Sequence, residues 1–238
     1  MKIACWSGPR NISTALMRSW SSRKDAEVLD EPFYSYYLKK TELEHPLSRE
    51  IIKRYPSNYD QVVKLVCSSV PNRKKIWYQK QMAHHIFKDD DIKFIRNFKN
   101  CFLIRHPKKV ISSFTKKNKL TDTNQLGYIQ QNRIINFLNE FGEKIIVIDS
   151  EVLLKNPKNI LQKWCSELNI EFDSNMLTWK KGIHKSDGIW AKHWYNSVMS
   201  TKNFEDNISK NPIVNKKYSK ILDECMVYYE QMKVAALK

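Results

Sequence analysis

Residues 7–14, SGPRNIST, bring together groups that bind anions. Arg10 supplies a cation, and the hydroxyls of Ser13 and Thr14 donate hydrogen bonds. The apolar run 3–6 precedes this segment, and apolar residues recur at helical spacing from Ile12 onward. A loop between a strand and a helix presents free backbone N–H groups and the positive end of the helix dipole. The predicted phosphate-binding residues are Ser7, Gly8, Pro9, Arg10, Asn11, Ile12, Ser13 and Thr14.

The alternative interpretation of this segment is an ordinary turn between a strand and a capped helix. Gly8 and Pro9 alone are typical of such a turn, whereas Arg10 with the two hydroxyls favours an anion site. The segment is not a Walker A phosphate loop, because Asn11 and Ile12 stand where that motif has glycine and lysine.

A second anion-binding pattern begins at Arg105, directly after the apolar run 100–104. Ser113 follows eight residues later, in the second turn of a helix that Pro107 is expected to begin. Arginine contacts a phosphate through two N–H groups, and the serine can donate a third hydrogen bond. An arginine followed by a helical serine is common by itself. Two such patterns at two strand ends, however, suit a nucleotide that carries two separate phosphates.

Glu31 is the first candidate for a group that accepts a proton, because it directly follows the apolar run 26–30. The second strand is expected to lie beside the first, which would place Glu31 next to the 7–14 loop. The alternative is that Asp30 or Glu31 only caps the next helix. His84 and His85 are rival bases, although a pair of histidines more often lies on a helix surface.

The elements that must position these residues alternate between apolar strands and amphipathic helices. Strands are expected at residues 3–6, 26–30, 75–79, 100–104 and 144–148, and helices at 12–20, 59–70, 107 onward, 124–141, 157–168 and 215 onward. This alternation predicts an α/β fold with three layers, α/β/α, around a central, mostly parallel sheet. Ligands of such sheets bind at the carboxyl ends of the strands, where both anion-binding segments and Glu31 are expected.

The chain of 238 residues is expected to form a single domain over residues 1–238, with residues 41–74 as a helical annex or lid. Its net charge of +16 suits an anionic ligand, but the lysines are too evenly spread to indicate nucleic acid. The five cysteines lack a CxxC pair, which indicates a reduced, cytoplasmic protein without a metal site. No apolar run is long enough for an integral membrane segment, and no signal-peptide pattern is visible.

The two anion-binding segments together resemble those of the sulfotransferases that use 3′-phosphoadenosine 5′-phosphosulfate (PAPS). In that family a loop such as Pro-Lys/Arg-Ser-Gly-Thr-Thr holds the 5′-phosphosulfate, and an Arg with a Ser eight residues later holds the 3′-phosphate. Residues 9–14 are similar to the first pattern, and Arg105 with Ser113 to the second. Residues 6–11, 30–32, 82–85 and 190–195 are similar to a bacterial sulfotransferase-like branch.

The resemblance implies a P-loop-like sulfotransferase fold, PAPS as the donor, no metal, and a hydroxyl or amine on a small-molecule or carbohydrate acceptor. It implies Arg10, Glu31 and His85 as catalytic candidates, because some members use a glutamate after the second strand and others a histidine in a Lys-x-His motif. Lys80-Gln81-Met82 lacks that histidine, and Ile12 replaces the glycine of the family's loop. The sequence identifies neither the acceptor nor an oligomeric state.

Residues 190–204 resemble the late loop that closes over the nucleotide in the family. Its candidate polar contacts are Lys192, His193, Ser200, Thr201 and Lys202, and the alternative is that its aromatic side chains only pack.

Two other functions stay open at this point. One is a P-loop kinase that uses ATP and magnesium, for which Asp149 is the nearest magnesium ligand. The other is a nucleotide or polyanion binder without catalysis.

Overall fold

The computed structural model describes residues 1–204 and 212–238, and its centre is a parallel sheet with the strand order β2-β3-β1-β4-β5. All four strand pairings of this sheet are parallel. The expected α/β fold class is therefore confirmed. The strands are β1 (Lys2–Ser7), β2 (Ala26–Asp30), β3 (Ile76–Met82), β4 (Lys99–Ile104) and β5 (Ile145–Asp149).

Helices cover both faces of the sheet because successive side chains of each strand point to opposite sides. Ile3 and Cys5 of β1 pack toward one layer, and Ala4 and Trp6 toward the other. The first layer contains α1 (Ser13–Ser21), α7 (Ser150–Lys155) and α8 (Pro157–Glu167). The second contains α4 (Tyr59–Cys67), α5 (Pro107–Phe114), α6 (Tyr128–Glu140) and α11 (Ser219–Lys233).

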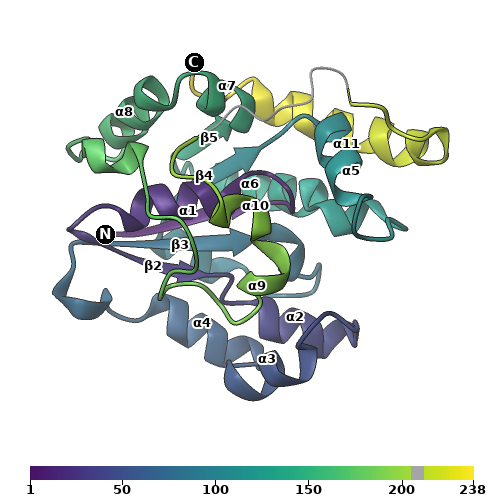
Figure 1. The fold of residues 1–238 in the computed structure, drawn as a ribbon, viewed down its shortest axis with the longest axis horizontal. Coiled ribbons are helices and arrows are strands. Elements are labelled where there is room, and N and C mark those ends of the chain that lie inside the picture. The colour runs from purple at the N-terminus through teal and green to yellow at the C-terminus, as the bar shows by residue number, and fades with distance from the viewer. Residues whose placement is uncertain (205–211) are drawn as a thin grey trace.

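A third, aromatic-rich cluster joins the chain after β2 to the late segment around Trp190. It contains side chains from α2 (Tyr34–Thr41), α3 (Ser48–Arg54) and α9 (Ala191–Trp194), which α10 (Asn196–Met199) follows. Figure 1 shows α2, α3 and α4 together beyond the β2 edge of the sheet, with α9 next to α2. This cluster brings residues 34–55 and 189–199 to one end of the sheet.

Several element boundaries differ from those that the sequence predicts. The expected helix at 124–141 is divided, because Gly127 adopts a positive φ of 79° between a 3-10 turn, Thr123–Leu126, and α6. The helix at 59–70 ends at Cys67, and the last helix begins at Ser219 rather than near residue 215. The strand expected at 75–79 extends to Met82 as β3. This extension places Lys80 inside the sheet.

The expectation that β2 lies beside β1 is wrong, since β3 pairs with both strands and separates them. Every residue of β3 is buried, as in a central strand, whereas burial alternates along β2, as in an edge strand. Glu31 therefore lies one strand further from the 7–14 loop than predicted. Its backbone N–H donates to the Lys80 carbonyl at 3.0 Å.

Candidate anion-binding and proton-transfer site

The loop at residues 7–14 has the backbone shape of an anion cradle. Arg10 and Ile12 have positive φ angles of 64° and 60°, and α1 begins directly afterwards at Ser13. Ile12 stands at the N-cap of α1 and supplies no side-chain cap. Left-handed residues at a helix start turn successive N–H groups toward one point, where an anion can accept from them. Ile12 adopts the conformation that glycine favours, at a cost of about 1–2 kcal/mol.

Gly8 is required because the loop packs directly against the turn that precedes α6. A Cβ on Gly8 would lie 2.0 Å from the carbonyl oxygen of Leu126, which is inside van der Waals contact. A Cβ on Gly127 would lie 3.1 Å from the Cα of Gly8. The two glycines therefore allow the loop and the α6 turn to approach each other closely.

The structure brings the two predicted phosphate-binding segments together. Arg10 Nε donates a hydrogen bond to Ser113 Oγ at 2.9 Å, and an Arg105 side-chain N–H donates to the Arg10 carbonyl at 2.8 Å. In the described part of the chain, neither arginine forms a salt bridge, and the buried Nε of Arg105 has no hydrogen-bond partner. Burial lowers the pKa of both guanidinium groups. An anion in this place would compensate two buried cations.

Glu31 is part of a buried charged cluster around Lys80. Lys80 Nζ donates to Glu31 Oε1 at 2.5 Å, to Asp30 Oδ1 at 3.0 Å and to the Tyr195 hydroxyl at 2.6 Å. Burial disfavours the ammonium ion, but the two carboxylates outweigh this and raise the pKa of Lys80. Burial also raises the pKa of Asp30, against the effect of Lys80.

Neither Asp30 nor Glu31 caps α2, since Phe33 occupies the N-cap without a side-chain cap. Lys80 and Tyr195 belong to this cluster although the sequence alone indicates no role for either. The available signal was a lysine inside an otherwise uncharged strand, between Tyr78 and Met82.

His84 and His85 lie in a 3-10 turn directly after β3 rather than on a helix surface. His85 is buried and stacks on Tyr34 and Tyr37, with ring centroids 5.2 Å and 4.6 Å away. Burial lowers the pKa of both histidines well below the ordinary value. A neutral imidazole can accept a proton, but this environment penalises the imidazolium that would form. Of the three candidate bases, His84 and His85 incur this penalty, and the assignment of Glu31 stays a prediction.

The late segment, taken here as residues 187–204, forms hydrogen bonds with the charged cluster around Lys80. The Gly188 N–H donates to Asp30 Oδ2 at 3.1 Å, and Trp190 Nε1 donates to the Tyr195 hydroxyl at 3.1 Å. Asp187 forms a buried salt bridge of 2.6 Å with Arg18 of α1. Trp190, Tyr195 and Phe204 of this segment are buried, so most of its aromatic side chains pack, which confirms the alternative interpretation.

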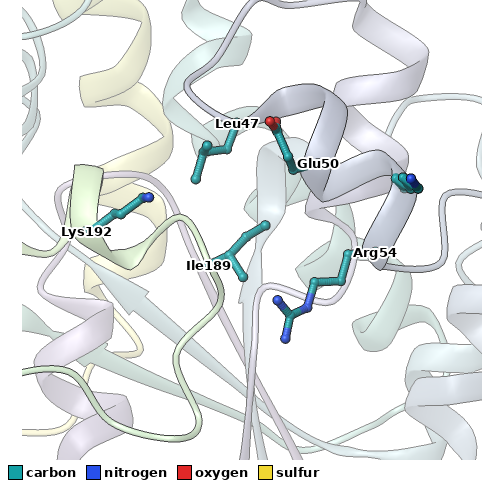
Figure 2. Close-up of a pocket in the computed structure, with 6 residues that line it drawn as sticks. Leu47, Glu50, Arg54, Ile189 and Lys192 are labelled. Atoms are coloured by element: carbon teal, nitrogen blue, oxygen red, sulfur yellow. The ribbon is translucent and has the colours of Figure 1, made fainter.

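An open cavity of about 690 Å³ lies between α3 and the late segment. In Figure 2, Ile189 and Lys192 face Leu47 and Glu50 across it. Lys53 and Arg54 complete the lining, which thus combines three cations and one carboxylate with the apolar side chains of Leu47 and Ile189. Ile189 adjoins Trp190, which links the cavity wall to Tyr195 and the Lys80 cluster.

Asp149 has structural partners at both carboxylate oxygens. One accepts from the backbone N–H of Glu151 at the start of α7, and the other from the Tyr229 hydroxyl, both at 2.7 Å. Among residues 1–204 and 212–238, no group of three or more His, Cys, Asp or Glu side chains is arranged to hold a metal ion. In the same ranges, none of the helices has the length and apolarity needed to cross a membrane. All five cysteines are free thiols.

Comparison with known proteins gives one family over nearly the whole chain. The model of the family described as a sulfotransferase domain matches residues 1–236. The fold is also that of solved sulfotransferases at low identity. These include the sulfotransferase domain from the curacin biosynthetic pathway (18% identity, 99% of this chain and 91% of that one, TM-score 0.52) and a sulfotransferase from Alicyclobacillus acidocaldarius (10%, 98% and 96%, TM-score 0.54).

Two curated relatives from Arabidopsis thaliana have greater identity. The branched-chain-amino-acid aminotransferase-like protein 2 is 30% identical over 227 residues, and protein 1 is 34% identical over 202 residues. The alignments cover 95% and 85% of this chain, but only 40% and 36% of those proteins. The chain thus spans well under half the length of these relatives.

Proposed function

The chain belongs to the sulfotransferase domain family, and we propose that it transfers a sulfuryl group from PAPS to a hydroxyl, or an amine, of a small-molecule or carbohydrate acceptor. The observation that carries the choice of donor is the hydrogen bond between Arg10 and Ser113. A donor with phosphates at the 3′ and 5′ positions of one ribose needs two neighbouring anion-binding groups. Arg10 and Arg105, whose guanidinium groups form no salt bridge among the described residues, meet this need.

The residues divide into a donor side and an acceptor side. The N–H groups of the loop, Arg10 and the hydroxyls of Ser13 and Thr14 hold the 5′-phosphosulfate, and Arg105 with Ser113 holds the 3′-phosphate. Glu31 accepts the proton of the acceptor as its oxygen bonds to sulfur. The bond between sulfur and the 5′-phosphate oxygen breaks, and Arg10 stabilises the charge on the leaving phosphate.

The cavity beside α3 is the proposed acceptor entrance. It is formed in part by residues 41–74, which supports their proposed role as a cover over the acceptor side. Lys53, Arg54 and Lys192 on its rim favour acceptors that carry negative charge of their own.

A thermal-shift comparison tests the choice of donor. Adenosine 3′,5′-bisphosphate should raise the Tm without magnesium, and by more than ATP does at equal concentration. A larger shift with ATP that requires magnesium would contradict the proposal in favour of a kinase. Binding of the bisphosphate without turnover of any acceptor in a broad panel would favour the non-catalytic binder.

A further inference from the structure

Two carboxylates share one ammonium group at the carboxyl end of β2 and β3. Lys80 forms salt bridges with both Asp30 and Glu31, at 3.0 Å and 2.5 Å. Among the described residues, no other cation reaches either carboxylate within salt-bridge distance. The cluster therefore holds two carboxyl groups against one ammonium group.

The two carboxylates differ in how their oxygens are occupied. Asp30 accepts from Lys80, from the Gly188 N–H and from the Tyr195 hydroxyl, which lies 2.8 Å from both of its oxygens. Its side chain is 2% exposed, whereas that of Glu31 is 12% exposed. Glu31 contacts the cluster through Oε1 alone. Glu31 is thus the open member, and Asp30 is held as a fixed, hydrogen-bonded carboxylate.

The charge balance decides whether Glu31 can work as a base. A lysine at 2.5 Å favours the ionised form of a carboxylate and so weakens it as a proton acceptor, while a nearby like charge has the opposite effect. The titratable groups that act on or contact Glu31 are Asp30 on β2, Lys80 on β3, Tyr34 on α2, His45 before α3 and Tyr195 after α9. Of these, Asp30 is the one that is a second carboxyl group.

We propose that Asp30 is a positioning residue that engages Lys80 and thereby keeps Glu31 able to accept a proton. This inference rests on the proposed function, in which Glu31 is the base. A merely structural role for Asp30 would be to anchor the late segment through Gly188 and Tyr195.

Carbon-13 NMR of protein labelled at the glutamate side-chain carboxyls tests the inference without donor or acceptor. The Glu31 signal is identified by its loss in Glu31→Gln. In Asp30→Asn, the pH midpoint of the Glu31 titration should fall, because Lys80 then acts on Glu31 alone. Asp25→Asn is the matched control. It removes a carboxylate about 16 Å away at the other end of β2, where Asp25 pairs with Arg23, and should leave the midpoint in place.

Steady-state kinetics give a second test, in which the effects on kcat and on the KM for the donor are compared. Asp30→Asn should lower kcat about tenfold and leave the KM for the donor unchanged, since the donor groups lie on other elements. If Asp30→Asn does not fold, Asp30→Ser takes its place, since serine also removes the carboxylate. The Glu31 midpoint should again fall, and an unchanged or higher midpoint overturns the inference.

The outcomes separate this inference from the proposed function. An unmoved midpoint in Asp30→Asn, with an inactive Glu31→Gln variant, overturns the role of Asp30 and leaves Glu31 as the base. Full turnover in Glu31→Gln overturns the assignment of Glu31 as the base. It also overturns the role of Asp30, which depends on that assignment. A lowered midpoint together with an inactive Glu31→Gln variant supports both.

Discussion

The side chain of Arg10 donates a hydrogen bond to Ser113 at 2.9 Å, across 103 positions of sequence. Each residue belongs to a sequence pattern that by itself is weak evidence for an anion-binding site. Their contact places a glycine-containing loop after β1 and a helix after β4 around one point at the carboxyl edge of the sheet. Ligands of open α/β sheets bind at this edge. The contact therefore supports one binding site rather than two unrelated surface features.

Arg105→Ala should weaken the binding of adenosine 3′,5′-bisphosphate and leave the fold intact. The loss of a charge-assisted contact from a partly buried site costs about 2–3 kcal/mol, which is about a thirty- to hundredfold loss of affinity. Isothermal titration calorimetry measures this, with Arg96→Ala as a control because Arg96 pairs with Glu143 at the surface. An unchanged affinity would show that the 3′-phosphate is held elsewhere.

Gly8→Ala should displace the loop and reduce both stability and nucleotide affinity. The new methyl group would collide with the Leu126 carbonyl oxygen, and overpacking of this kind costs about 1–3 kcal/mol. Urea unfolding and bisphosphate titration measure the two effects. Gly142→Ala is the control for nucleotide affinity, because its positive φ makes alanine strained there while nothing lies within 4 Å of the new Cβ. Equal nucleotide affinity of the two variants would contradict a specific contact between the loop and the α6 turn.

The sequence predicted the strands well because each is a short apolar run with a clear boundary. The position of β3 was not predictable, since the order of strands depends on packing across the whole sheet. Lys80 illustrates the difficulty. A lysine argues against a central strand until its partners, Asp30 and Tyr195, are known to surround it.

The candidate site was predictable where function depends on local sequence. The loop, Arg105 and Ser113 form motifs of fixed spacing, and the structure brings them together. The positive φ of Ile12 was not predictable, because a β-branched residue rarely adopts it. The burial of His85 depends on Tyr34 and Tyr37, which lie about fifty residues earlier.

The stability of the protein should fall as the pH drops below about 6.5. Burial lowers the pKa of His84 and His85 well below the ordinary value, so the unfolded chain binds protons in this range that the folded chain does not. The sign follows from linkage, because excess proton binding by the unfolded state lowers the free energy of unfolding as the pH falls. Each histidine contributes up to about 1.4 kcal/mol per pH unit.

Urea unfolding between pH 7.5 and 5.5 measures this slope, a range chosen around the ordinary histidine value of about 6.5. His85→Phe should reduce the pH dependence of the free energy of unfolding by the contribution of one histidine. Phenylalanine can stack on Tyr34 and Tyr37 without binding a proton. His184→Gln is the control, because that ring hydrogen-bonds to the exposed Lys180 carbonyl, away from the aromatic cluster around His85. A slope that His85→Phe leaves unchanged would show that His85 does not carry the linkage.

Glu31→Gln should leave donor binding nearly intact and abolish most turnover. Glutamine keeps the shape and can still accept a hydrogen bond from Lys80, but it has no basicity. Loss of a general base costs about 10²–10⁴-fold in rate. Bisphosphate affinity and the rate of sulfuryl transfer to a panel of hydroxyl and amine acceptors are measured on the same preparation, with His85→Ala and His84→Ala beside it.

The three variants distinguish the possible bases by their pattern. A carboxylate gives no benefit to the binding of an anionic donor, so a rate effect without an affinity effect would place Glu31 on the acceptor side. If Glu31→Gln keeps near wild-type turnover and His85→Ala or His84→Ala loses it, the base is a histidine despite its buried ring. If all three variants stay active, the proton leaves to solvent or to the substrate. If Glu31→Gln fails to fold, the contact with Lys80 at 2.5 Å is needed for structure, and the rate argument for Glu31 is lost.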